Sequence, residues 1–110
     1  MRINLFKQST IEDFAKENAG SVDPFKLWLI KIKAADWEKP DDMKSTFPSA
    51  DLLGKGSNRV IFDIGGNNYR IICKYWVGAD RFSLFIKWIG THAQYDALCK
   101  QNKQYTVDTY

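Results

Sequence analysis

The stretch Arg59–Gly90, "RVIFDIGGNNYRIICKYWVGADRFSLFIKWIG", decides the fold of this chain. Apolar and polar residues alternate through it, and alternation with a period of two is typical of β-strands. The glycines and asparagines of Gly65–Asn68 favour a tight hairpin turn, and Gly78–Asp80 favours a second turn. Because both connections are short, we predict an antiparallel meander of three strands, with Gly90 ending the third. The predicted strands are Arg59–Ile64, Tyr69–Val77 and Arg81–Ile89.

The residues before the meander favour helices. Apolar residues recur at helical spacing in "VDPFKLWLIKIKAADW", residues 22–37, which is the strongest helix pattern. Ser9 and Glu12 have the spacing of a capping box, which indicates a shorter helix that ends at Gly20. We therefore predict an α+β fold in one domain over residues 1–110, with an N-terminal strand and two to three helices packed on one face of an antiparallel sheet. The other predicted elements are a strand over Arg2–Phe6, a short helix over Asp41–Thr46 and a tail, from about residue 101, that is expected to fray.

Alternation assigns two faces to the sheet, because successive side chains of a strand point to opposite sides. One face is nearly all apolar and is expected to cover the helices; by this rule it includes Trp88, while Ile89 falls on the other face. That other face, which we call the cationic face, interleaves cations with aromatic residues and so suits single-stranded nucleic acid. Lys and Arg are also routine on the solvated side of a half-exposed sheet, and periodicity alone favours that interpretation. The residues concerned are Arg59, Arg70, Lys74, Arg81 and Lys87, with Ile72, Trp76 and Phe85.

His92 is the only histidine, and it follows the third strand in the segment Thr91–Asp96, "THAQYD". RNA can be cut without a metal when a base takes the proton of the 2′-hydroxyl, cations stabilise the phosphorane and an acid protonates the leaving oxygen. His92 and Tyr95 are candidate proton carriers. Arg70 and Lys87 are candidate phosphate ligands, and the Arg70 guanidinium offers a bidentate fork. A lone histidine or tyrosine near a strand is more often structural, so residue types alone make a nuclease the minority interpretation.

Composition argues against several other classes. The net charge of +3, from 16 Lys and Arg against 13 Asp and Glu, permits an anionic partner but is low for a dedicated duplex-DNA binder. Cys73 and Cys99 lack metal-type spacing, so we expect neither a metal site nor a cofactor. The N-terminus has no apolar signal region, and no window reaches the roughly 20 apolar residues of a membrane span. We therefore expect a cytoplasmic protein.

Three motifs, in order along the chain, resemble those of the HigB toxins of bacterial type II toxin–antitoxin systems, which belong to the RelE-like mRNA interferases. They are "FPSAD" at Phe47–Asp51, "FDIGGN" at Phe62–Asn67 with Arg70 opening the next strand, and "THAQYD" at Thr91–Asp96. The resemblance implies a RelE-like fold and a metal-independent endoribonuclease that cuts mRNA on translating ribosomes. It also implies neutralisation by a HigA-type helix-turn-helix antitoxin, with operator DNA bound only through the antitoxin complex.

The resemblance also gives roles to individual residues. Arg70 and Lys87 would stabilise the scissile phosphate. His92 and Tyr95 would move protons or orient the RNA. The residues expected to bind RNA away from the cut bond are Lys55, Arg59, Asn67 and Lys74, of which Lys74 is included on strand alternation alone.

Two alternatives stay open at this level. A toxin of the same fold could inhibit DNA gyrase, as ParE does, although ParE-like chains usually lack the histidine–tyrosine pair of "THAQYD". A non-catalytic module could instead use the cationic face to bind RNA without cutting it.

Overall fold

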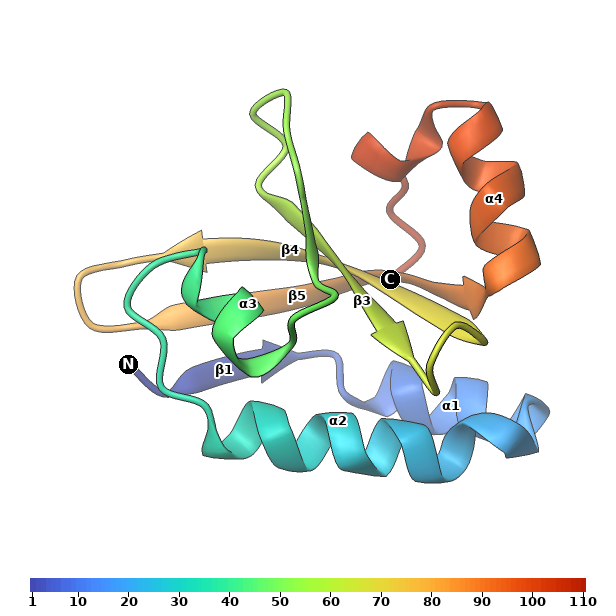
Figure 1. The fold of residues 1–110 in the computed structure, drawn as a ribbon, viewed down its shortest axis with the longest axis horizontal. Coiled ribbons are helices and arrows are strands. Elements are labelled where there is room, and N and C mark those ends of the chain that lie inside the picture. Colours follow the sequence, from blue (N-terminus) through green and yellow to red (C-terminus); the bar gives the residue numbers. More distant parts are fainter.

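The computed structural model describes residues 1–110 and confirms the predicted α+β class, which is consistent with a RelE-like fold (Figure 1). The strands form one five-stranded sheet in the order β1-β5-β4-β3-β2. They are β1 (Ile3–Phe6), β2 (Asp51–Leu53), β3 (Arg59–Ile64), β4 (Tyr69–Val77) and β5 (Phe82–Thr91). The helices are α1 (Ser9–Glu17), α2 (Val22–Ala34), α3 (Asp42–Thr46) and α4 (His92–Lys100), with single 3₁₀ turns η1 (Ala19–Ser21) and η2 (Lys103–Tyr105).

The sheet is mixed, whereas the sequence predicted an antiparallel one. The strands β2 to β5 pair antiparallel in chain order, which confirms the meander, but β1 pairs parallel with β5. A parallel pair needs a long crossover, and the chain supplies one because α1, α2 and the rest of the meander separate β1 from β5. The short strand β2 was not predicted, since the segment around Asp51–Leu53 is rich in turn residues.

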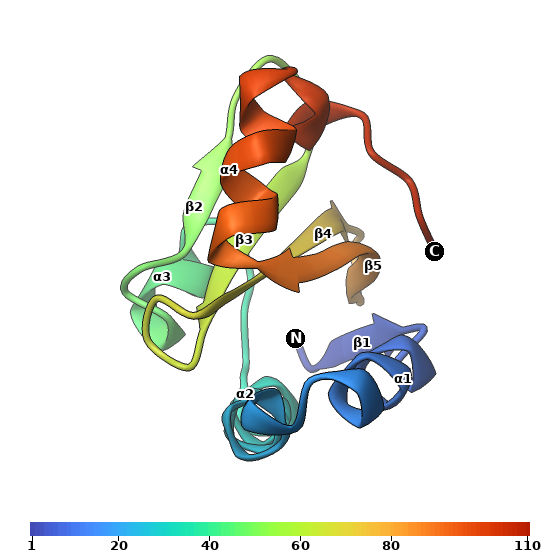
Figure 2. The same ribbon diagram turned by 90° about the vertical axis from the view of Figure 1, so that its right-hand side faces the viewer.

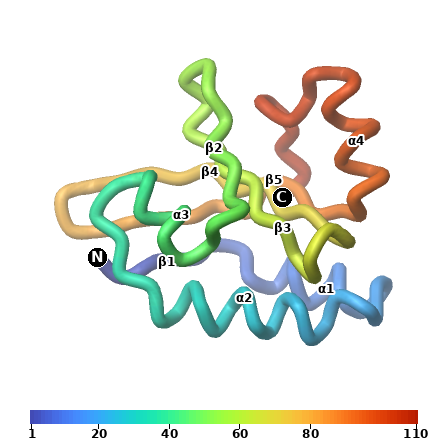
Figure 3. Tube along the Cα trace, viewed as in Figure 1, coloured from blue at the N-terminus to red at the C-terminus, as the bar shows by residue number.

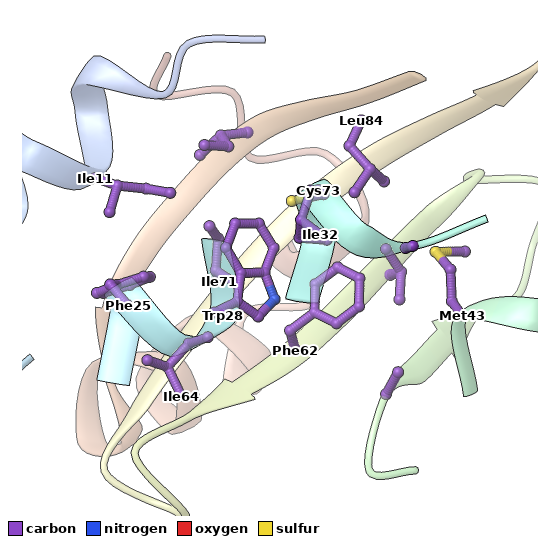
Figure 4. Packing of buried hydrophobic residues seen from close by; sticks show 14 of the residues in the cluster. Ile11, Phe25, Trp28, Ile32, Met43, Phe62, Ile64, Ile71, Cys73 and Leu84 are labelled. Atoms are coloured by element: carbon purple, nitrogen blue, oxygen red, sulfur yellow. The ribbon is translucent and has the colours of Figure 1, made fainter. Parts of the chain in front are cut away.

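The helices α1 and α2 cover one face of the sheet, and the hydrophobic core lies between these layers (Figures 1 and 4). Phe25, Trp28 and Ile32 of α2 are buried at the spacing that the sequence predicted. Trp28 packs against Phe62 of β3, with ring centroids 5.5 Å apart. Burying a large apolar side chain contributes about 1.5–3 kcal/mol to folding, so this layer fixes the helices on the sheet.

A β-bulge in β5 changes the predicted faces. The β4–β5 ladder shifts register between Ile72 and Cys73, and Lys87 of β5 has no partner across it. The extra residue reverses the alternation that follows. Ile89 therefore packs in the core, and Trp88 lies opposite Ile72 on the cationic face. The predicted sides of Trp88 and Ile89 were wrong because alternation holds only along an uninterrupted strand.

The helix α4 was not predicted, and it follows β5 without a loop. β5 continues through Gly90 to Thr91 instead of ending before Gly90. The Thr91 hydroxyl accepts a hydrogen bond from the backbone N–H of Gln94 (3.2 Å), and the Gln94 side chain accepts one from the N–H of Thr91 (2.9 Å). This is the capping box of the chain; Ser9 and Glu12 form none, because α1 already begins at Ser9.

The helix α4, η2 and the C-terminal tail lie on the side of the sheet opposite α1 and α2 (Figure 2). The β2–β3 hairpin projects on that side beside them (Figure 3). Ile61 and Ile72 of the cationic face are buried there, outside the main core. Ile72 is therefore inaccessible to RNA, contrary to the open face that the sequence predicted. None of the helices combines the length and apolar character needed to cross a bilayer.

Candidate functional site

Arg70 of β4 is the centre of a polar cluster at the end of the sheet where α4 begins. Its Nε lies 3.1 Å from a carboxylate oxygen of Asp63, its strand partner on β3. Its Nη1 donates to the backbone carbonyl of Tyr69 (3.1 Å), and its Nη2 donates to the side-chain oxygen of Asn67. The same Nη2 lies 3.0 Å from Nδ1 of His92. Arg70 is only 7% exposed, and protein acceptors occupy its guanidinium in the free protein, so a phosphate must displace one of them to use the predicted fork.

The tautomer of His92 follows from this contact. A guanidinium only donates hydrogen bonds, so Nδ1 of His92 must accept one and the ring proton of the neutral imidazole lies on Nε2. That Nε2 is 3.2 Å from a carboxylate oxygen of Asp96, one turn along α4. The capping box at Thr91 fixes the start of α4 and hence the position of His92 as its first residue. His92 is therefore held on both ring nitrogens.

Tyr95 completes the cluster on the next position of the same helix face. Its ring lies 5.9 Å from the Arg70 guanidinium carbon and 6.2 Å from the Trp88 ring. Burial raises the pKa of Tyr95, the neighbouring Cys99 and Asp51 raise it further, and Arg70 lowers it. The phenol consequently keeps its proton at neutral pH and can only donate it or share it in a hydrogen bond.

Gly90 gives Trp88 its place in the cluster. Gly90 lies opposite Arg70 in the sheet, and a Cβ on it would come within 2.4 Å of the Trp88 indole and 2.8 Å of the Gln94 side chain. The missing side chain therefore lets the indole lie over the strand and support Tyr95. Neither Gly90 nor Trp88 was predicted to belong to the site; only a bulge at Lys87 could have moved Trp88 there, and the alternation pattern gives no sign of it.

The C-terminal tail lies on the cationic face and occupies two of the predicted RNA ligands. Nζ of Lys87 is 3.2 Å from a carboxylate oxygen of Asp108. Nη1 of Arg59 donates to the backbone carbonyls of Val107 (2.6 Å) and Gln104 (3.3 Å), and Arg59 is only 6% exposed. Arg59 thus anchors the tail in this structure, and its predicted role as a phosphate ligand stays a prediction. Fraying of the tail concerns motion and stays a prediction.

The other predicted RNA ligands lie near the Arg70 cluster or near the C-terminal tail. Lys55 is exposed on the β2–β3 loop, with its ammonium 4.8 Å from the Tyr105 ring centroid. Asn67 lies in the β3–β4 turn and binds Arg70. Lys74 is exposed and lines a groove with Lys87. Of the four predicted catalytic residues, the fold brings Arg70, His92 and Tyr95 together and places Lys87 at the bulge, nearer to Lys74.

No three His, Cys, Asp or Glu side chains lie close enough together to hold a metal ion. The only acid beside His92 is Asp96, and the only acid beside Arg70 is Asp63. The cluster offers an imidazole, a protonated phenol and a guanidinium.

Comparison with known proteins finds similarity to toxins of toxin–antitoxin systems. A family model described as HigB toxin, RelE-like toxic component of a toxin-antitoxin system, matches residues 21–98. The chain is 34% identical over 73 residues to a protein of Escherichia coli O6:H1 named "mRNA interferase HigB", covering 66% of this chain and 69% of that protein. It is 28% identical over 94 residues to "mRNA interferase toxin HigB" of Escherichia coli K12, covering 86% and 88%. The matched residues include the whole polar cluster around Arg70.

Proposed function

This chain belongs to the HigB toxin family of RelE-like toxic components, and from that premise we propose that it is an endoribonuclease that cuts mRNA and so stops translation and growth. The names of its relatives support the reaction, and they do not favour the gyrase-inhibitor alternative. The observation that carries the proposal is the contact of Arg70 with His92, 3.0 Å apart, beside the phenol of Tyr95. These three side chains have the chemical types that metal-free RNA cleavage requires.

In the proposed reaction His92 is the base. In the free protein the lone pair of its Nδ1 accepts a hydrogen bond from Arg70 and is not available to take a proton. An RNA phosphate that takes over the Nη2 hydrogen bond releases Nδ1, which then accepts the proton of the 2′-hydroxyl. Asp63 keeps the guanidinium in place through Nε during this exchange. Arg70 thus couples phosphate binding to the availability of the base.

Tyr95 is the acid in this proposal. The 2′-oxygen bonds to phosphorus, the bond to the 5′-oxygen breaks, and the phenol gives its proton to that leaving oxygen. The raised pKa of Tyr95 keeps the proton on the phenol until the leaving oxygen becomes basic. The products are a 2′,3′-cyclic phosphate and a 5′-hydroxyl, and the imidazolium of His92 returns a proton to the phenol afterwards.

The cations around the cluster bind the rest of the RNA. Lys87 stabilises the phosphate charge once Asp108 leaves it, and Lys74 and Lys55 hold flanking phosphates. Asn67 supports the RNA site indirectly, because it positions Arg70. Arg59 contributes only if the tail moves, since the tail carbonyls fill its Nη1.

The partners follow from the family. A toxin of a toxin–antitoxin pair implies an antitoxin and an RNA substrate. We assign the finer details to the same proposal: the antitoxin is a HigA-type helix-turn-helix protein, the mRNA is cut on the ribosome, and operator DNA is bound through the antitoxin. An adjacent reading frame for such a protein, whose co-expression restores growth, would support this assignment.

The test is brief induction of the chain in bacteria, followed by mapping of mRNA 5′ ends with translation running and with translation blocked. New ends inside coding regions, lost when translation is blocked, support cleavage on the ribosome. Growth arrest with unchanged transcripts and a DNA-damage response would indicate gyrase inhibition and contradict the proposal.

A further inference from the structure

Two large aromatic side chains on the cationic side of the sheet are exposed outside the core. Trp76 of β4 is 59% exposed and Phe6 of β1 is 45% exposed. Phe6 stacks on Phe85 of β5, with ring centroids 4.7 Å apart and planes at 10°. The indole of Trp76 lies close to Gly78, where a Cβ would come within 2.6 Å of it. Neither exposed ring belongs to the core, so folding alone does not explain them.

Trp76 and Phe85 line one groove on this face, and Phe6 stands beside the groove, stacked on Phe85. Phe6 pairs with Phe85, Phe85 pairs with Lys74, and Trp76 stands two residues from Lys74 on the same face of β4. The groove beside them has a volume of about 440 Å³. Its lining residues are Asn58, Lys74, Tyr75, Trp76, Phe85 and Lys87. Lys74 has no ion-pair partner, so its charge is available to an anion.

We propose that this groove binds an unpaired nucleobase of the RNA substrate, with the base stacked on Trp76 or on the Phe6–Phe85 pair and its phosphate on Lys74. Aromatic rings beside a cation match the two parts of a nucleotide, because every base has a flat apolar face and every phosphate a negative charge. The unpaired charge of Lys74 beside the rings favours a nucleotide over a protein side chain, and binding of the antitoxin is an outcome of the test below. The inference rests on the proposed function, because it extends the same RNA strand across the sheet.

The bound nucleotide lies outside the cut bond. Lys74 stands four residues from Arg70 along β4, which corresponds to about 13 Å at 3.3 Å per residue. The polar cluster around Arg70 and this groove are therefore two subsites joined by one strand. The buried stretch between them, at Ile72, gives the RNA backbone no ligand, so binding at both ends is needed to hold the strand.

The experiment measures the affinity of the full chain for a labelled single-stranded RNA carrying 2′-O-methyl groups, whose 2′-oxygens cannot attack. We expect Trp76→Ala to weaken binding about 5- to 150-fold, and Phe6→Ala, which removes the ring stacked on Phe85, to weaken it less. Leu27→Ala is the matched control, since Leu27 is 55% exposed but lies on α2, on the other side of the sheet, and its affinity should equal that of the wild type. Lys74→Ala should reduce the slope of log affinity against log salt concentration by about 1, the value for one lost phosphate contact.

A scan with single abasic nucleotides identifies the stacked base. An abasic nucleotide at one position away from the cut bond should weaken RNA binding by the wild type. The same abasic nucleotide should not weaken RNA binding by Trp76→Ala any further. The inference is overturned if Trp76→Ala and Phe6→Ala bind like Leu27→Ala while the wild type still cuts RNA. It is also overturned if these variants keep their RNA affinity but escape neutralisation by the antitoxin, which would make the rings a protein-docking surface. A wild-type chain whose induction in cells produces no new mRNA ends would overturn the proposed function itself.

Discussion

The guanidinium of Arg70 on β4 donates to Nδ1 of His92 at the start of α4, across 3.0 Å. This contact connects strand β4 to helix α4, which carries both candidate proton carriers, His92 and Tyr95. It also sets the histidine in the tautomer with its proton on Nε2.

Replacing Arg70 by lysine keeps the charge but removes the planar fork. A lysine ammonium cannot reach Asp63, Asn67 and His92 together, so we expect RNA cleavage to fall about 10²- to 10⁴-fold. Stability should fall by about 1–3 kcal/mol, because the buried Arg70 side chain loses its hydrogen bonds to these acceptors. Cleavage rate and thermal unfolding measure the two effects. Arg81→Lys is the control, since Arg81 is exposed and outside the cluster.

The same variant has a second readout. The chain contains one histidine, so ¹⁵N NMR reports on His92 without overlap. In the wild type the neutral ring of His92 should carry its proton on Nε2. In Arg70→Lys the spectrum should show a mixture of the two tautomers. A wild-type signal from a protonated Nδ1 in the neutral ring would contradict the assigned contact.

Tyr95 should make stability depend on alkaline pH. Its pKa is raised above the ordinary value of about 10, so above that pH the native chain holds a proton that the unfolded chain has released. The stabilisation is present below pH 10 and is lost as the pH rises through the native pKa. Chemical unfolding from pH 8 to 11 should therefore show a smaller decline for Tyr95→Phe than for the wild type. Equal declines would mean that Tyr95 titrates normally; Tyr110 and Cys73, whose pKa values burial also raises, are common to both proteins.

Adding a methyl group at Gly90 should disturb the site by displacing Trp88. The new Cβ would lie 2.4 Å from the Trp88 indole, which must move and withdraw its support from Tyr95. We expect Gly90→Ala to cost about 1–3 kcal/mol and to reduce cleavage more than this loss of stability explains. Gly54→Ala is the matched control, because a Cβ there meets nothing within 4 Å. Equal activity of the two variants at a temperature where both are folded would argue against a role for Trp88.

Freeing Lys87 from the tail should strengthen RNA binding. Asp108→Asn removes the carboxylate that lies 3.2 Å from Nζ of Lys87. Exposed ion pairs contribute about 0.2–1 kcal/mol, so affinity should rise by at most about fivefold and most strongly at low salt. Asp80→Asn makes the same change of net charge at an exposed site without an ion-pair partner. If both variants gain equally, the effect is one of net charge, and Lys87 is not released by the tail.

Local patterns predicted most of the fold because they depend on neighbours in the sequence. The meander followed from alternation and glycine turns, and α2 from its apolar spacing. β1 could not be assigned to a parallel edge, since pairing of Ile3–Phe6 with β5 depends on how the helices return the chain. The helix α4 could have been predicted, because Thr91 and Gln94 have the spacing of a capping box.

The candidate site was predicted in its residue types and less well in its geometry. Arg70, His92 and Tyr95 lie in two short motifs, so their proximity followed once the strands were aligned. The bulge at Lys87 was invisible, and it moved Trp88 into the site and Ile89 out of the cationic face. The occupation of Arg59 by the tail depends on a contact between residues 45 and 48 positions apart, which no local pattern reports.

The most direct test of the central claim is the chemistry of the RNA ends that the chain produces. RNA is taken from cells after brief induction of the wild type or of His92→Ala, and 5′-hydroxyl ends are captured by a ligase selective for them and sequenced. Attack by the 2′-oxygen, with His92 as base, predicts new 5′-hydroxyl ends inside mRNA with the wild type and about 10²- to 10⁴-fold fewer with His92→Ala. New ends that carry a 5′-phosphate, or equal numbers of 5′-hydroxyl ends from both proteins, would contradict the account.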